Sequence, residues 1–217
     1  MVGMAVRKKV GRKEWLLLGI ILGSFVPDMD NVAVAVATLM KAPTEGIHRM
    51  MTHIVFFMAA IVIVFYLIGR LKKEERWSNL GLGLGLGIMF HSLLDLLIWF
   101  NGVNLFWPLG GEVNFWANTT PPVWFLKFMD PAEFLFFGLY LWALGSWVRK
   151  TSTDSSYIKT HRAWLILEAA LFAIFNPLTY LMTKGFHTLF GAFYLFSLFM
   201  TFFVTIRMRK TVEAATG

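Results

Sequence analysis

The sequence alternates between long apolar runs and short polar connections. The apolar residues fill six runs, at residues 15–40, 50–69, 79–100, 131–148, 163–182 and 187–206. A helix needs about 20 residues to cross the hydrocarbon core of a bilayer. The pattern therefore predicts an all-α fold, a polytopic transmembrane bundle of about six spans. The fourth run is short for a span, and the first is interrupted by Pro27, Asp28 and Asp30.

The composition favours a membrane domain over a soluble one. Hydrophobic residues make up 57% of the 217 residues and charged residues only 15%, whereas a soluble domain carries about 25% charge. The absence of cysteine excludes disulfides and thiol catalysis. A net charge of +7 would suit nucleic acid, but the basic residues cluster between the apolar runs, as membrane topology requires. We therefore expect the lipid bilayer as a partner, and no nucleic acid.

The basic residues also predict the orientation of the chain. Most of the 20 Lys and Arg residues lie in alternate connections between the runs. Because basic connections stay in the cytoplasm, both termini are predicted to be cytoplasmic, and the chain is a multi-pass protein of the cytoplasmic (inner) membrane. An interfacial or re-entrant first run is the main alternative. The connection at residues 101–130 is rich in Trp, Pro and Asn, and it is either a capping loop or a substrate-binding loop.

Several acids and histidines fall at a similar depth in the predicted spans. At a rise of about 1.5 Å per residue, Asp28 lies roughly 20 Å from the cytoplasmic end of the first run. By the same measure His91, Asp95 and His53 lie roughly 18 to 24 Å across the third and second runs. His48 lies just beyond, near the outer surface. Since ionisable groups inside a membrane usually face a partner or a cavity, we expect these side chains to meet in its outer half.

These side chains are of the types that hold a transition metal. His91 and Asp95 are four residues apart and share one helical face. Asp28 and Asp30 are two apart, so they reach one site only if the backbone departs from a helix, which Pro27 favours. Imidazole and carboxylate suit zinc most directly, with manganese or iron as alternatives, and the set exceeds what one tetrahedral zinc takes. We predict one or two or more divalent ions, bound by Asp28, Asp30, His48, His53, His91 and Asp95.

The same residues have roles in a hydrolase. Divalent ions activate water and offset the charge of a phosphoryl group. We expect Asp30, His91 and Asp95 to carry catalysis. Arg49 lies beside His48 and is expected to bind a substrate phosphate oxygen, because a guanidinium matches phosphate geometry.

Three other ionisable residues are expected to lie outside this site. His161 is predicted to be solvated in a cytoplasmic loop. Glu168 is predicted to form a structural pair near the cytoplasmic end of the fifth run. His187 lies at the start of the sixth run, on the outer side, and we expect that it does not bind the metal.

The stretch "GLGLGLG", residues 81–87, is a packing motif rather than a phosphate loop. A phosphate loop would continue with Lys and Ser or Thr, and would not lie inside a span. Gly81 with Gly85, and Gly83 with Gly87, are small residues four apart. Such pairs let membrane helices approach closely. The motif predicts that the third span packs tightly against its neighbours.

Three motifs resemble those of a known family. The stretches "GSFVPDMDN", "HRMMTH" and "FHSLLDLLIWFNGVNLFWPL" resemble, in order and character, the YdjM-like family, described as LexA-binding, inner-membrane-associated, metal-dependent hydrolases. The resemblance covers residues 19–110. It implies the same six metal ligands, with Arg49 beside them, although Met50, Ile54 and Phe90 replace a Gly and two Ser of the family pattern. The family is in turn distantly similar to zinc-dependent phospholipase C, and a LexA-type partner follows only from its label.

The sequence thus predicts one membrane domain over residues 1–217, with a metal-site half at 1–110 and a supporting helical half at 111–217. The function predicted is a membrane-embedded, metal-dependent hydrolase acting on a phosphoester such as a lipid. One alternative is an ion or solute transporter, because intramembrane acids and histidines also build ion paths. Another is a non-catalytic membrane regulator with a structural metal.

Overall fold

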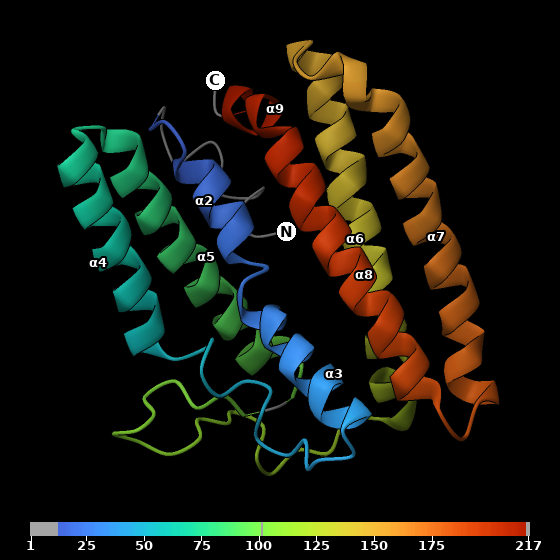
Figure 1. Cartoon of the computed structure of the whole chain (residues 1–217). Helices are drawn as coiled ribbons and strands as arrows, with labels where there is room; N and C mark the ends of the chain where they lie inside the picture. The colour runs from blue at the N-terminus through green and yellow to red at the C-terminus, as the bar shows by residue number, and fades with distance from the viewer. Residues whose placement is uncertain (1–12, 101, 216–217) are drawn as a thin grey trace. The chain divides into compact units, whose positions relative to one another are not determined.

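The computed structural model describes residues 13–100 and 102–215 (Figure 1). Helices dominate these residues, and their only β-structure is an isolated bridge between Val103 and Val113. The helical elements in chain order are α2 (Leu16–Gly23), η1 (Pro27–Asp30), α3 (Asn31–Leu39), α4 (Val55–Lys72), α5 (Glu75–Ile98), α6 (Val123–Thr151), η2 (Ser155–Tyr157), α7 (Ile158–Leu181), α8 (Phe186–Arg207) and α9 (Arg209–Ala214).

Five helices are long and apolar enough to cross a membrane, namely α4, α5, α6, α7 with η2, and α8. A sixth span is formed if α2 and the η1–α3 segment, which bend by 41° at their break, count as one. The all-α polytopic fold predicted from the sequence is therefore confirmed. The prediction of a short fourth span is wrong, because α6 has 29 residues and begins at Val123. Pro131 lies inside it, as is tolerated in membrane helices.

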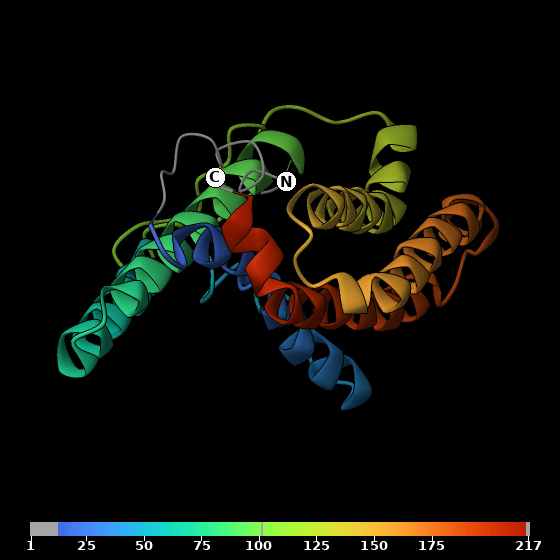
Figure 2. The same cartoon turned by 90° about the horizontal axis from the view of Figure 1, so that it is seen from above.

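The chain divides into two compact units. The first lies within residues 1–120, and the second spans Pro121–Ala215. In the first unit, α2 and α4 both pack against α5, and α5 is therefore the central helix of this unit (Figure 1). In the second unit, α6 packs against both α7 and α8 (Figure 2).

The glycines of α5 explain how closely the first unit is packed. A Cβ added at Gly83 or Gly87 would clash with backbone atoms of α2, including the carbonyl oxygens of Leu16 and Ile20. A Cβ added at Gly81 would instead clash with Phe65 of α4. The two glycine pairs therefore face different helices, as close packing through small residues allows. The contact holds α2, whose eight residues are all buried, directly against α5.

The second unit is built on aromatic packing at one end. Phe134 of α6, Phe175 of α7 and Phe186 of α8 form a buried cluster with Leu171. Their rings meet at centroid distances of 5.1 to 6.2 Å, in the range where aromatic pairs attract. One prediction fails in this unit. His161 is buried in α7 rather than solvated, and its Nε2 contacts the carbonyl oxygen of Leu141 at 2.7 Å.

Candidate metal centre

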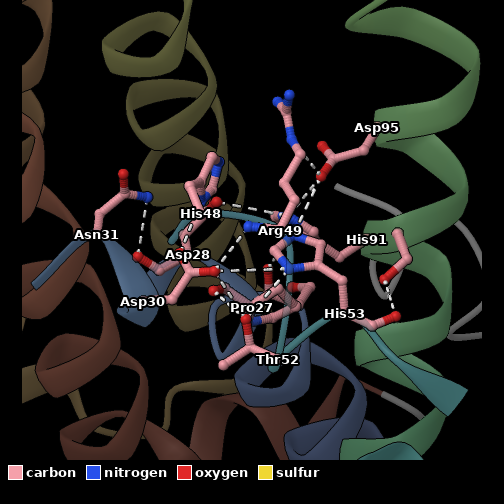
Figure 3. Close-up of polar contacts among 12 residues, drawn as sticks. Pro27, Asp28, Asp30, Asn31, His48, Arg49, Thr52, His53, His91 and Asp95 are labelled. Atoms are coloured by element: carbon pink, nitrogen blue, oxygen red, sulfur yellow. Dashed lines mark hydrogen bonds and ion pairs between the residues drawn. The ribbon is translucent and has the colours of Figure 1, made fainter. Parts of the chain in front are cut away.

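The polypeptide breaks its first span at the two aspartates. Pro27 opens the four-residue 3₁₀ turn η1, where its missing N–H is tolerated. In a regular helix Asp28 and Asp30 would point far apart. The tighter turn and the bend that follows α2 bring both into one group of polar side chains (Figure 3). The break predicted from Pro27 is therefore present in the structure.

Asp30 anchors the loop that precedes α4. Its Oδ1 contacts Nδ1 of His48 at 2.6 Å, and its Oδ2 accepts hydrogen bonds from the backbone N–H of Arg49 at 3.0 Å and the hydroxyl of Thr52 at 2.9 Å. Arg49 has a left-handed backbone, with φ of 67°, a conformation that costs free energy unless contacts hold it. The carboxylate of Asp30 thus fixes the loop that carries His48 and His53.

Four further side chains converge beside this anchor. His91 Nε2 lies 3.5 Å from Asp28 Oδ1 and 3.5 Å from Asp95 Oδ2. His53 Nε2 lies 3.2 Å from the same Asp95 oxygen. His53 is fully buried, and Asp95 is 7% exposed. Ligand atoms of Asp28, His53 and His91 all lie within 4.8 Å of one another, which is close enough for one ion to reach all three.

The hydrogen bonds assign which nitrogen of each imidazole bears a lone pair. His91 Nδ1 lies 2.9 Å from the carbonyl oxygen of Ser24. Because a carbonyl can only accept, Nδ1 of His91 carries the proton and Nε2 of a neutral ring is free to bind a metal. His53 Nδ1 lies 3.1 Å from the Thr52 hydroxyl, whose own proton goes to Pro27 or Asp30. Nε2 of a neutral His53 is therefore also a lone-pair atom.

These atoms have no hydrogen-bond partner, although they are buried. The set includes His53 Nε2, His91 Nε2 and Asp95 Oδ2. Lone pairs that face one another across about 3 to 4 Å repel, and unpaired buried polar groups are costly. A cation between them would remove both costs. The residues therefore fit a divalent metal bound by two imidazoles and two carboxylates, as zinc, manganese and iron accept.

The charge balance gives the same result. Asp28, Asp30 and Asp95 contribute three carboxylates to this group, and Arg49 contributes one guanidinium, whose Nε lies 3.3 Å from Asp95 Oδ2. With neutral histidines, two negative charges remain without a compensating charge. A divalent cation would neutralise them, which matters because uncompensated charge is expensive in a poorly solvated site.

The structure brings all seven residues singled out in the sequence into one group (Figure 3). The seven residues occupy different positions within this group. Asp28, His53, His91 and Asp95 form the inner cluster, while Asp30 and His48 pair with each other at its side. Arg49 contacts Asp95 through Nε, and its terminal nitrogens extend past that carboxylate. His187 belongs to the second unit, where it is 87% exposed and faces Asp130.

Sequence reasoning missed the groups that orient the ligands. Thr52 contacts Pro27, Asp30 and His53, and the backbone carbonyl of Ser24 fixes the His91 ring. Ser92 donates to the carbonyl oxygen of His53 at 3.4 Å. Outer-shell partners of this kind set the tautomer of a metal-binding histidine. Thr52 could have been noticed, because it directly precedes His53; a backbone carbonyl leaves no signal in a sequence.

One comparison with known proteins gives a result. The model of a family described as YdjM inner membrane protein matches residues 1–212, which is almost the whole chain. No curated protein and no solved structure matches the chain. The match extends through both compact units, and therefore well beyond the three motifs that form the polar group.

Proposed function

We propose that this chain, which belongs to the YdjM inner membrane protein family, is a membrane-embedded hydrolase that holds a divalent metal ion through Asp28, His53, His91 and Asp95. The five to six apolar spans fit a multi-pass protein of the inner membrane. The observation that carries the proposal is the convergence of ligand atoms from three separate segments of the first unit, among which those of His53, His91 and Asp95 are buried and have no hydrogen-bond partner.

Each residue of the group has a role in the proposed reaction. Asp28, His53, His91 and Asp95 hold the ion, and zinc is the best candidate for this donor set. When bound, the ion would act as a Lewis acid that makes water a better nucleophile. His91 and Asp95 also touch the reacting atoms in this proposal, whereas Asp30 keeps the His48–His53 loop in place. Arg49 would use its terminal nitrogens for a phosphate oxygen, because its Nε is held by Asp95 and a guanidinium has further donors.

A lipid phosphoester is the substrate class that the surroundings support. Helix α3 follows Asp30 directly and exposes apolar side chains, among them Val36 at 50% and Leu39 at 82%. Helix α4, which follows the His48–His53 loop, is also largely exposed along its apolar length. In a bilayer these surfaces contact acyl chains. A lipid would therefore reach the metal centre from the membrane, with its phosphate next to Arg49.

The direct test is turnover in a lipid environment. The purified full-length protein in nanodiscs is supplied with zinc or manganese, and the phosphate-containing headgroups released from phosphatidic acid and other phospholipids are measured by mass spectrometry. We expect release that stops with a chelator and in Asp95→Asn. If the wild-type protein binds metal but releases nothing from any phosphoester, the hydrolase proposal is wrong and the metal is structural.

Removal of the Thr52 hydroxyl should weaken metal binding without unfolding the protein. In Thr52→Val, His53 Nδ1 loses its acceptor and Asp30 loses one donor. Loss of such an outer-shell contact lowers metal affinity by about 10- to 100-fold. Competition with a fluorescent zinc chelator measures this affinity. Thr38→Val is the matched control, because the exposed Thr38 hydroxyl only contacts its own helix; equal affinities in the two variants would contradict the role given to Thr52.

A further inference from the structure

The second unit encloses a separate group of buried polar side chains. These are Tyr140 of α6, His161 and Glu168 of α7, and Ser197, Thr201 and Thr205 of α8. All are at most 3% exposed, although the helices that carry them are otherwise rich in phenylalanine and leucine. Polar groups inside a membrane bundle are costly and mark functional positions more often than structural ones.

Burial is most costly for Glu168, the acidic member of this group. It lies near the middle of α7, and its side chain is completely buried. Neither carboxylate oxygen has a hydrogen-bond partner, and no ion pair involves Glu168 within the described part of the chain. The structural pair expected from the sequence is therefore not formed there. An ionised carboxylate in this position would be strongly destabilised unless a cation accompanies it.

Helix α8 supplies two more oxygen atoms that lack partners. Ser197 and Thr201 are four residues apart and lie on one face of α8, and neither hydroxyl has a hydrogen-bond partner. Ser197 interacts with the Glu168 carboxylate without reaching hydrogen-bond geometry. One turn further along, Thr205 donates to the carbonyl oxygen of Thr201 at 2.8 Å and contacts Tyr140 at 2.7 Å. On this face of α8, the hydroxyl of Thr205 therefore has partners, whereas those of Ser197 and Thr201 do not.

Helix α6 leaves room at this level. Gly138 faces α7, and a Cβ added there would lie 3.6 Å from Cβ of Glu168. The backbone of α6 therefore approaches Glu168 without a side chain in between. Glu168 and Ser197 therefore lie together beside a glycine, with Thr201 one turn from Ser197 on α8, in a unit separate from the candidate metal centre.

We propose that Glu168, Ser197 and Thr201 form a binding site for a monovalent alkali cation of the sodium class. The donors are oxygen atoms alone, which suit a hard cation and not zinc or copper. One carboxylate balances one positive charge, whereas a divalent ion would leave excess charge in the apolar bundle. The cation would give a partner to the four unpartnered oxygen atoms of Glu168, Ser197 and Thr201.

The other polar residues of the group lie to one side of the proposed site. His161, Tyr140 and Thr205 lie between Glu168 and the turn joining α6 to α7. The helix ends on both sides of that turn carry basic residues, which predict a cytoplasmic location. Towards the opposite end lies the cluster of Phe134, Phe175 and Phe186. The polar side chains therefore lie on the predicted cytoplasmic side of Glu168, and the aromatic cluster lies on the other side.

The test is a cation titration of the full-length protein. Thermal unfolding in detergent is followed in buffers containing sodium, lithium, potassium or the bulky cation N-methylglucamine. We expect sodium to raise Tm saturably by about 2–5 °C, N-methylglucamine to have no effect, and Glu168→Gln to abolish the response. Ser197→Ala and Thr201→Val should shift the sodium midpoint to concentrations at least tenfold higher. Glu75→Gln, which changes an exposed glutamate of α5, should respond as wild type does.

Two outcomes would overturn the proposal. The first is a sodium response that is equal in wild type and Glu168→Gln, since the ion would then bind elsewhere. The second is a Glu168 carboxyl that stays protonated at every sodium concentration, as judged from its infrared C=O stretch, since the side chain would then hold only a proton. Asp95→Asn separates this site from the metal centre, because it should lose divalent metal and keep the sodium response.

Discussion

Replacement of His91 by alanine should remove the divalent metal ion from the purified protein. His91 Nε2 faces both Asp28 and Asp95, so its loss takes away the one nitrogen ligand that links α5 to η1. We expect metal content measured by mass spectrometry to fall from about one ion per chain to below about a tenth, and affinity to fall by at least about 100-fold, more than for an outer-shell change. Phosphoester turnover should fall with it.

A histidine elsewhere in the chain provides the control. His187→Ala alters an exposed imidazole of the second unit, and it should keep wild-type metal content and turnover. Treatment of the wild-type protein with a chelator should reproduce the His91→Ala result, and added zinc should restore only the wild type. Equal metal content and equal turnover in the His91→Ala and His187→Ala proteins would exclude the proposed centre. Full metal content in His91→Ala with lost turnover would instead assign His91 to catalysis alone.

Replacement of Gly87 by alanine should cause a large loss of stability in the first unit. The new methyl group would meet the carbonyl oxygen of Ile20 and backbone atoms of Gly23. Backbone atoms cannot rotate away as a flexible side chain can, so α2 and α5 must separate. Overpacking of this kind costs about 1–3 kcal/mol, and because the clash is with backbone we expect a cost at the upper end of this range, above the gain of about 1 kcal/mol from the better helix propensity of alanine.

The consequence should extend to the metal centre. Gly23 lies at the end of α2, directly before the bend that places Asp28 and the Ser24 carbonyl. A displaced α2 would move both relative to His91. We therefore expect Gly87→Ala to lower Tm and also to weaken zinc binding, measured by chelator competition.

Gly191→Ala is the matched control for this prediction. It lies in α8, and a Cβ added there would meet no atom within 4 Å. This variant should have an unchanged or slightly higher Tm, because alanine favours the helix. A Tm for Gly87→Ala as high as that of Gly191→Ala would show that α2 and α5 are not packed as described here.

The candidate ligands were predictable because their positions follow from helix geometry. The rise per residue places His91 and Asp28 at matching depths, and the spacing of His91 and Asp95 puts both on one face. Pro27 predicted the break in the first span, which η1 forms. The roles within the group were not predictable in the same way. Asp30 uses its oxygens for His48, Arg49 and Thr52, and this depends on how a loop folds back over η1.

The sequence by itself determined the all-α polytopic class, most of the helical spans and the residue types available for chemistry, because these depend on hydrophobicity and spacing along the chain. Only the tertiary structure decided which neighbour each glycine pair of α5 faces, and which nitrogen of His91 is free. It also buried His161 and Glu168, whose surroundings come from α6 and α8. Such facts depend on contacts between segments distant in the chain, and a local sequence pattern does not specify which distant segment it will contact.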